Sequence, residues 1–384
     1  MEVTGPELPV ELDIGAKINY DLGYIRADDE LQAAFPGFDG SHDTLRRLSF
    51  SFLGRFSDVV EMKFEIDFAN TQDIKDDWIR ITLDPVLPYF TIGHLKEPFS
   101  LDMLTSGNYT TFMEVSLPTR AFTPFRNIGF TANGTWWEER MTWAAGSFLN
   151  TGAFGSEGES QDQIDKANGF DLVGRITGLP LYGNDGKRLL HLGLSYLQRY
   201  RNDDEDDPSA QFRTRPESRL TDDRLVDTSR IYDQGQHLIS LEAAWMDGPW
   251  SIQGEYFHDF VDSTSSLQFN GWYVQTSWVL TGESRNYQNS GGVFSGITPE
   301  SEFCFGRDGW GALELALRFS NVDLNDKYVK GGEEQNITVG LNWYLKPKIR
   351  FMVNYINARM EDRTDPVVDN GRADIIMSRC QVNF

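Results

Sequence analysis

Two arginines separated by a single threonine, Arg213 and Arg215, stand in a polar stretch of the chain. In an extended segment, side chains two residues apart point the same way. Their guanidinium groups could therefore face one anion together, because a planar guanidinium fork matches a pair of phosphate oxygens. The spacing indicates a site for a small oxyanion. A ladder of such groups could pass an anion stepwise, since conduction requires binding that is favourable but not too tight.

The same stretch is rich in carboxylates, which offer the two arginines a different role. The acidic residues are Asp203, Asp204, Glu205, Asp206, Asp207, Asp222, Asp223 and Asp227. Local neutralisation of the arginines is as consistent with this composition as an anion ladder, so both interpretations stand.

Enzymatic chemistry has weaker support. The five histidines are His42, His94, His191, His237 and His258, and their spacing is not that of a zinc site. The chain has neither a nucleophile elbow nor a glycine-rich phosphate loop. We therefore expect no enzyme activity, no cofactor and no metal. A barrel hydrolase using His191 with Glu242 or Asp259 remains an alternative, although a titratable residue in a wet lumen is more often a lining residue.

Strands are the elements that must position these groups. Apolar residues alternate with polar ones from residue 11 onward, as in Leu12, Ile14, Ala16 and Ile18 against Asp13, Lys17 and Asn19. No run of about 18 apolar residues occurs, which excludes a transmembrane helix. A closed sheet can cross a membrane with segments of about 9 to 11 residues that are apolar on one side only. The mean hydropathy of −0.43 is compatible with such a barrel.

About sixteen such segments can be counted, so we predict an all-β fold, a transmembrane antiparallel β-barrel formed by residues 1–384 as one domain. Short connections at 57–58, 137–139, 247–248 and 346–348 alternate with long ones at 29–43, 97–126, 151–167, 201–235 and 362–372. Short turns on one rim and long loops on the other are typical of bacterial outer-membrane barrels. The segment 283–308 is long on the predicted short-turn rim and does not fit this rule.

Charge and cysteine content restrict the partners. A formal net charge of −23 argues against nucleic acid, whose binding requires clustered positive charge. Inward-facing acids at Asp13, Glu61, Glu65, Asp67, Glu242 and Glu255 would favour a cation-leaning pore. Cys304 and Cys380 are too few for a disulfide framework. Cys380 shares a strand face with Ile376 and Val382, which favours an apolar, outward position.

Several short motifs occur in a fixed order along the chain. They are Lys96-Glu97-Pro98-Phe99, Phe112-Met113-Glu114, Arg126-Asn127-Ile128-Gly129, Leu280-Thr281-Gly282-Glu283-Ser284-Arg285, Gly311-Ala312-Leu313-Glu314-Leu315-Ala316 and Arg318-Phe319-Ser320. Together they resemble the phosphate-selective porin O and P family, and the similarity spans most of the chain. Several motifs in the right order are more specific than any one of them.

The resemblance implies a homotrimeric, sixteen-stranded channel in the bacterial outer membrane, whose third long loop folds inward and narrows the pore. It also implies that phosphate or another small anion binds there. The substrate-binding residues that it implies are Arg46, Arg47, Lys96, Ser106, Arg126, Arg213 and Arg215.

Two of these assignments have simpler alternatives. Adjacent Arg46 and Arg47 cannot both face the lumen in a regular strand, so one of them snorkels, pairs with an acid or lies at a bulge. Arg47 shares its face with Ser49 and is the better candidate. Lys96 could form only an exposed ion pair with its neighbour Glu97, which contributes little.

We therefore expect a porin for passive uptake of small anions, with phosphate or pyrophosphate first. The alternatives are a general diffusion porin with weak or cation-leaning selectivity, a structural or adhesive barrel, and the hydrolase described above.

Overall fold

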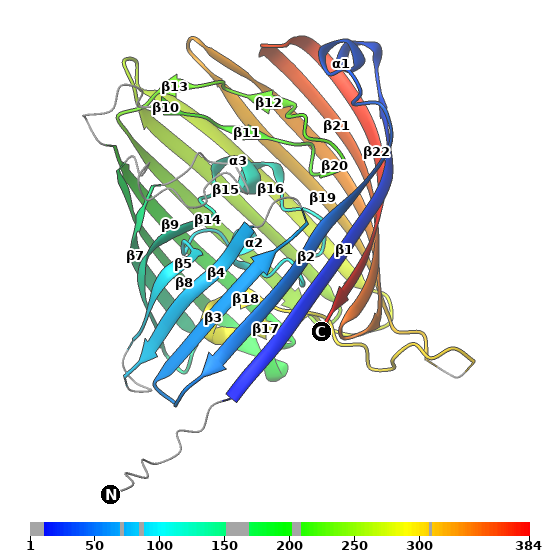
Figure 1. The fold of residues 1–384 in the computed structure, drawn as a ribbon. Helices are drawn as coiled ribbons and strands as arrows, with labels where there is room; N and C mark the ends of the chain where they lie inside the picture. Colours follow the sequence, from blue (N-terminus) through cyan, green and yellow to red (C-terminus); the bar gives the residue numbers. More distant parts are fainter. Residues whose placement is uncertain (1–10, 70–72, 84–87, 151–168, 202–208, 307–308) are drawn as a thin grey trace, which may run out of the picture.

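The computed structural model describes residues 11–69, 73–83, 88–150, 169–201, 209–306 and 309–384. Within these residues, sixteen antiparallel strands form one closed barrel (Figure 1). The first and last strands pair, from Lys17 opposite Asn383 to Ala27 opposite Ala373, so the sheet has no open edge. The predicted all-β barrel is confirmed. No helix in the described ranges has the length and apolar character needed to cross a membrane.

The wall strands, in barrel order, are β1 (Glu11–Ala27), β2 (Gly40–Arg55), β3 (Val60–Asp67), β4 (Asp73–Thr82), β5 (Tyr89–Lys96), β6 (Arg126–Trp136), β7 (Met141–Leu149), β8 (Phe170–Gly183), β9 (Arg188–Tyr200), β14 (Gly235–Asp247), β15 (Trp250–Asp262), β16 (Leu267–Val279), β19 (Ala312–Asp326), β20 (Val329–Lys346), β21 (Ile349–Thr364) and β22 (Val367–Asn383).

The two faces of the wall differ as the alternation predicts. On β14, Leu241 is 53% exposed on the outside, whereas the next residue, Glu242, is 3% exposed and faces inward. Near the short-turn rim, Trp250 and Trp278 stack with ring centroids 4.7 Å apart. Outward aromatic rings of this kind are favoured at the boundary between lipid and water.

The loops depart from the prediction in two places. Residues 362–372 are not a long loop, because β21 and β22 run through this segment and only Asp365 and Pro366 separate them. The exposed positions of this segment carry polar residues such as Asp362, Thr364 and Asp369, whereas Arg363 and Val368 are buried. Likewise β2 begins at Gly40, inside the predicted 29–43 loop, which holds the short helix α1 (Asp29–Ala34).

The connection between β5 and β6, residues 97–125, is the third on the rim opposite the short turns and is called the third loop; it lies inside the barrel, as predicted (Figure 1). It carries the short helices α2 (Leu101–Leu104) and α3 (Leu117–Phe122), and α3 lies beside β15, β16 and β19. Aromatic rings fill the space between. Phe122 packs on Phe257 of the wall and on Phe212 of the connection between β9 and β14, with centroids 6.4 Å and 5.8 Å apart. One side of the interior is thus a hydrophobic core, which leaves the open space beside β1 to β7.

The fifth connection on the same rim, residues 201–234, is called the fifth loop and is described at residue 201 and from residue 209 onward. It contains two small ladders, β10 (Ser209–Ala210) with β13 (Ile231–Tyr232) and β11 (Arg213–Thr214) with β12 (Val226–Asp227). The remaining predicted long loop, 151–167, falls outside the described residues.

The segment 280–311 joins β16 to β19 at the short-turn rim and turns back into the barrel as a hairpin of β17 (Tyr287–Gln288) and β18 (Val293–Phe294) (Figure 1). Phe294 packs against Leu101 of the third loop and Leu189 of the wall. The rest of the segment projects outward. Cys304 lies on that outer part and Cys380 lies on β22, and both are free thiols.

Candidate functional site

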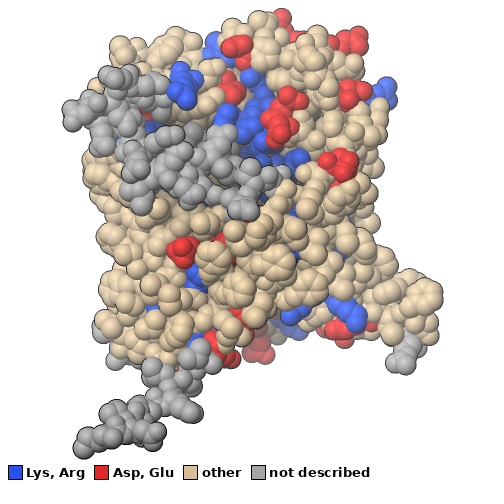
Figure 2. All heavy atoms as spheres, in the orientation of Figure 1, with Lys and Arg blue, Asp and Glu red and all other residues tan. Residues whose placement is uncertain are grey.

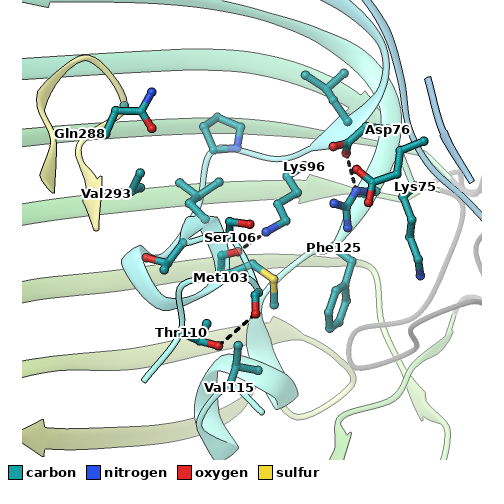
Figure 3. Close-up of a pocket in the computed structure, with 18 of the residues that line it drawn as sticks. Lys75, Asp76, Lys96, Met103, Ser106, Thr110, Val115, Phe125, Gln288 and Val293 are labelled. Atoms are coloured by element: carbon teal, nitrogen blue, oxygen red, sulfur yellow. Dashed lines mark hydrogen bonds and ion pairs between the residues drawn. The ribbon is translucent and has the colours of Figure 1, made fainter. Parts of the chain in front are cut away.

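A cavity of about 600 Å³ lies inside the barrel beside β1 to β7, between the wall, the third loop and the β17–β18 hairpin (Figure 3). Its basic lining residues are Lys17, Arg46, Arg47, Lys63, Lys75, Arg80, Lys96, Arg120, Arg126, Arg175 and Arg379. Its acidic lining residues are Glu65, Asp76 and Glu114. Eleven basic groups against three acidic ones give this space, which we call the basic cavity, a strongly positive lining, although the chain as a whole is acidic.

A β-bulge places both adjacent arginines in the basic cavity. Asn19 of β1 pairs with Arg47, whereas the next residue, Tyr20, pairs with Leu45, so Arg46 is the extra residue of β2. A bulge interrupts the alternation of faces at this point. The expectation that only one of the two faces the lumen in a regular strand therefore does not apply, and Arg46 and Arg47 both line the cavity.

A second irregularity acts on β4. Phe64 of β3 pairs with Asp77, but Ile66 pairs with Ile74, so Lys75 and Asp76 together oppose a single residue. Both side chains reach the basic cavity (Figure 3).

Lys96, Arg126 and Asp76 form the centre of the site. Lys96 ends β5 directly opposite Arg126, which begins β6. Arg126 Nε donates to Asp76 Oδ1 at 2.6 Å, and Lys63 also contacts this carboxylate. The Lys96 ammonium donates to the carbonyl of Met103 in the third loop (Figure 3).

The third loop brings its own polar groups to the same space. Ser106 lines the cavity, and its hydroxyl accepts the Asn108 N–H at 3.4 Å. Arg47 lies beside Gly107, where an added Cβ would stand 3.0 Å from Nη1 of the arginine. The alternative exposed pair of Lys96 with Glu97 is wrong, because Glu97 is fully buried and accepts from Asn127 at 2.7 Å.

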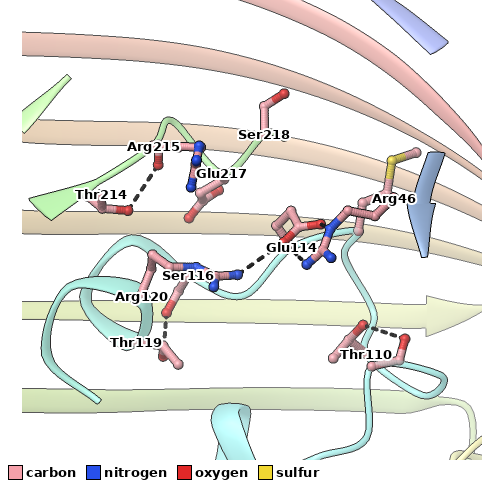
Figure 4. A network of polar contacts seen from close by, with 12 residues as sticks. Arg46, Thr110, Glu114, Ser116, Thr119, Arg120, Thr214, Arg215, Glu217 and Ser218 are labelled. Carbon is pink, nitrogen blue, oxygen red and sulfur yellow. Dashed lines mark hydrogen bonds and ion pairs between the residues drawn. The ribbon is translucent and has the colours of Figure 1, made fainter. Parts of the chain in front are cut away.

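Glu114 of the third loop is the hub of a buried network (Figure 4). Arg46 binds both of its oxygens, at 2.7 and 3.1 Å, while Arg120 and Arg379 contact it at 3.1 and 2.9 Å. Burial disfavours the carboxylate, but the three arginines outweigh burial and hold the pKa of Glu114 well below its usual range. Burial lowers the pKa of Arg120 to about 10, which leaves it protonated at neutral pH. The hub is therefore a fixed cluster of charges.

Carboxylates also fix the third loop to the opposite wall. Glu255 accepts the N–H groups of Leu101 and Asp102 at 3.0 and 2.7 Å. Glu217, from the fifth loop, accepts the N–H of Leu117 at 3.2 Å and pairs with Arg318 at 2.7 Å. Both carboxylates therefore bind backbone N–H groups of the third loop and do not face the open cavity.

The acids predicted to line the lumen also have partners, which are basic side chains or backbone N–H groups. Glu65 pairs with Lys17 at 2.8 Å, Glu242 with Arg175 at 2.7 Å, and Asp67 accepts the N–H of Leu48 at 3.0 Å. Near the short-turn rim, Asp13 and Glu61 both pair with Arg55.

Comparison with known proteins identifies the family. The family model described as phosphate-selective porin O and P matches residues 13–384. The chain belongs to this family. It is 28% identical over 349 residues to an uncharacterised protein of Caulobacter vibrioides and 24% identical over 316 residues to Porin O of Pseudomonas aeruginosa, matches that include 88% and 73% of this chain. The chain covers 66% of the length of each of these relatives.

The fold agrees with this assignment. The anion-selective porin from Comamonas acidovorans superposes with a TM-score of 0.60 at 10% identity, covering 98% of this chain and 100% of that one. The resemblance seen in the sequence is thus confirmed, and the barrel is a porin of the bacterial outer membrane.

In this porin, five of the seven predicted site residues come together. Arg46, Arg47, Lys96, Ser106 and Arg126 all line the basic cavity. They come from β2, β5, β6 and the third loop, so no single segment of sequence contains the site.

The other two predicted residues belong to the fifth loop and lie outside the cavity lining. Arg215 donates to Asp222 at 2.7 Å and to the carbonyl of Thr221, while Arg213 stands opposite Asp227 in the β11–β12 ladder. Arg215 is thus neutralised locally by Asp222, which is one of the two interpretations considered from the sequence. Figure 4 shows Arg215 above Arg120.

Arg219 of the fifth loop was not predicted and interacts electrostatically with Arg120 and Arg46. Burial, and then these two arginines, lower the pKa of Arg219 well below its usual value.

The other residues that sequence reasoning missed fall into two groups. Lys17 and Lys63 stand at inward positions of regular strands, so the alternation alone could have nominated them. Arg379 likewise stands at an inward position of β22, whereas Lys75 and Arg120 carry no such signal, because a bulge and an inward loop bring them to the cavity.

Proposed function

We propose that this porin is a passive outer-membrane channel for small hydrophilic anions, with phosphate or pyrophosphate as the leading solutes. The observation that carries the proposal is the basic cavity, whose lining is positive in a chain of net charge −23. Clefts lined by one sign of charge raise the local concentration of counter-ions and speed their entry.

The lining residues suggest how an anion is held. Arg47 and Arg126 present guanidinium groups, Lys96 an ammonium and Ser106 a hydroxyl, all from the walls of one cavity. Such groups can replace part of the hydration shell of a phosphate. Asp76 already occupies donors of Arg126 and Lys63. It therefore weakens their hold on an entering anion, and a channel needs binding weak enough for release.

The alternatives from the sequence have less support. A hydrolase requires a reachable base, but the ring of His191 is fully buried between Tyr287 and Glu242, at 2.7 and 3.2 Å, and helps to hold the β17–β18 hairpin. The acidic composition that favours a cation-leaning porin or an adhesive barrel is offset inside by the pairings described above. Along the upper rim, Figure 2 shows acidic residues around an opening in which Lys and Arg gather.

The test is the reversal potential of the purified porin in a planar lipid bilayer under a potassium chloride gradient, followed by phosphate titration against the chloride current. Anion preference with saturable block by phosphate is the expected result. Cation preference without block would instead indicate a general diffusion porin, and no conductance would favour the structural or enzymatic alternatives.

A further inference from the structure

The outer part of the 280–311 segment is a short arm that projects sideways from the short-turn rim (Figures 1 and 2). We define the arm as residues 297–306 and 309–311. Two of its aromatic side chains, Phe305 and Trp310, are 94% and 74% exposed. These are the highest values among the large apolar side chains that the structure describes. Nothing in the basic cavity or in the proposed transport of anions uses them.

The arm has a defined backbone shape. Cys304 N–H donates to Gly309 O at 3.4 Å, and Gly311 N–H donates to Ser301 O at 3.0 Å, which closes it as a hairpin. Gly311 has φ +73°, and an added Cβ there would stand 2.2 Å from the carbonyl oxygen of Tyr344. A larger residue does not fit this conformation without strain. The exposed rings of Phe305 and Trp310 therefore project from a hairpin with a defined backbone conformation.

The root of the arm is fastened to the outer face of the barrel. Phe303 N–H donates to the carbonyl of Leu345 at 2.8 Å, and the Trp343 indole donates to the carbonyl of Trp310 at 2.6 Å. The rings of Phe303 and Trp343 meet edge to face at 5.3 Å. Trp343 lies on β20, on the outward face marked by Leu341, and it neighbours Phe351 of β21. The arm thus starts from the outward aromatic residues near the short-turn rim.

We propose that the arm lies along the periplasmic leaflet of the outer membrane, with Phe305 and Trp310 inserted among the phospholipid headgroups. The wall already sets the membrane boundary at Trp343, and a hairpin leaving the wall sideways at that level continues in the plane of the headgroups. Aromatic rings are favoured in this layer. Lys346 at the root, 3.7 Å from Glu302, adds a cation suited to lipid phosphates.

A phospholipid surface fits the arm better than a protein does. Two aromatic side chains bury about 150 to 250 Å² each. That is well below the roughly 800 Å² per partner of a stable protein interface. Insertion into headgroups requires no matching surface, so two exposed rings on a hydrogen-bonded hairpin are sufficient.

The free thiol of Cys304 on the arm makes the proposal testable in the whole porin. In the Cys380→Ser variant, Cys304 is labelled with bimane and the protein is reconstituted into phosphatidylethanolamine–phosphatidylglycerol vesicles. The vesicles contain either brominated phospholipid as a shallow quencher or iodide on both sides as an aqueous quencher. The control label is Asp185→Cys, in a chain lacking both native cysteines. Asp185 is an exposed residue of the β8–β9 turn on the same rim.

We expect the lipid quencher to act several-fold more strongly on the Cys304 label than on the Asp185 label, and iodide to act less. Phe305→Ser with Trp310→Ser should abolish both differences and leave the conductance unchanged. The backbone carbonyl that binds Trp343 is retained in this variant. Tyr328→Ser, which removes an aromatic ring that is 59% exposed on the opposite rim, should change neither.

Equal quenching at both label positions would overturn the proposal, since it would place the arm in water. Protection from both quenchers, with Cys304 cross-links between protomers, would also overturn it and would identify a second copy of the chain as the partner.

Discussion

Reversing the charge of Lys96 should weaken phosphate binding in the basic cavity by a predictable amount. Lys96 ends β5 at the cavity wall, opposite Arg126, and its ammonium reaches the third loop. At about 4 Å in a water-like medium, one unit charge attracts an anion by about 1 kcal/mol. Lys96→Gln removes this attraction and should weaken phosphate block about 5-fold. Lys96→Glu replaces it with an equal repulsion, about 2 kcal/mol in all, and should weaken block about 30-fold.

The assay is the phosphate concentration that halves the chloride current through single channels in planar bilayers at about 0.1 M salt. At this ionic strength charges more than about 10 Å away are largely screened. Lys187→Glu is the matched control, because it makes the same charge change at an exposed turn outside the cavity lining.

Two outcomes would refute the reasoning. If Lys96→Glu shifted the half-blocking concentration no more than Lys187→Glu, the residue would not be part of the anion path. If Lys96→Gln and Lys96→Glu had equal effects, loss of the bond to Met103 rather than charge would be the cause.

Further predictions concern the elements that shape the cavity and the assembly of the barrel. Glu114→Gln leaves three arginines facing a neutral group, and breaking such a buried pairing costs about 3 to 5 kcal/mol. Single-channel recordings of this variant should show a larger, noisier conductance. Glu302→Gln at the rim is the control and should leave the current unchanged. The pKa of Glu114 is depressed in the folded state, so the stabilisation that its carboxylate gives the third loop is complete above the unfolded pKa of about 4.3 and is lost as pH falls through the folded-state pKa. The conductance should therefore be steady between pH 8 and 5 and change only in stronger acid. The Glu114→Gln variant should lack this acid-induced change. Arg175→Gln removes donors to the carbonyls of Gly291 and Gly292 and should free the β17–β18 hairpin, which would raise the conductance; Arg188→Gln, at an exposed neighbouring turn, is the control. The homotrimer that the family implies should survive mild detergent on a native gel and dissociate on boiling, and a monomer under all mild conditions would contradict it.

The regular part of the barrel could be predicted from the sequence because a strand in lipid repeats its pattern every two residues. Leu241 and Glu242 face opposite sides as their positions indicate. The prediction fails where the backbone departs from that repeat. The bulge at Arg46 turns both Arg46 and Arg47 inward, and nothing in the local sequence pattern predicts it.

Segments folded inside the barrel were harder to predict for a different reason. The β17–β18 hairpin is held by Arg175 and by the packing of Phe294, contacts between residues more than a hundred positions apart. A periodic pattern depends only on residues that are close in sequence, so it cannot predict contacts of this kind. Arg215 shows the same limit, because its spacing from Arg213 fits an anion site but its nearby Asp222 takes the guanidinium.

The carboxylates that hold the third loop divide the interior into two sectors with separate duties. Glu255 and Glu217 fasten the loop from one side, whereas Lys17, Lys63 and Arg80 line the cavity on the other side and pair with carboxylates of the wall. Substitutions at Lys17, Lys63 or Arg80 can therefore alter the solute preference while the scaffold that sets the pore width stays intact. This separation makes the barrel a practical starting point for redesigned channels.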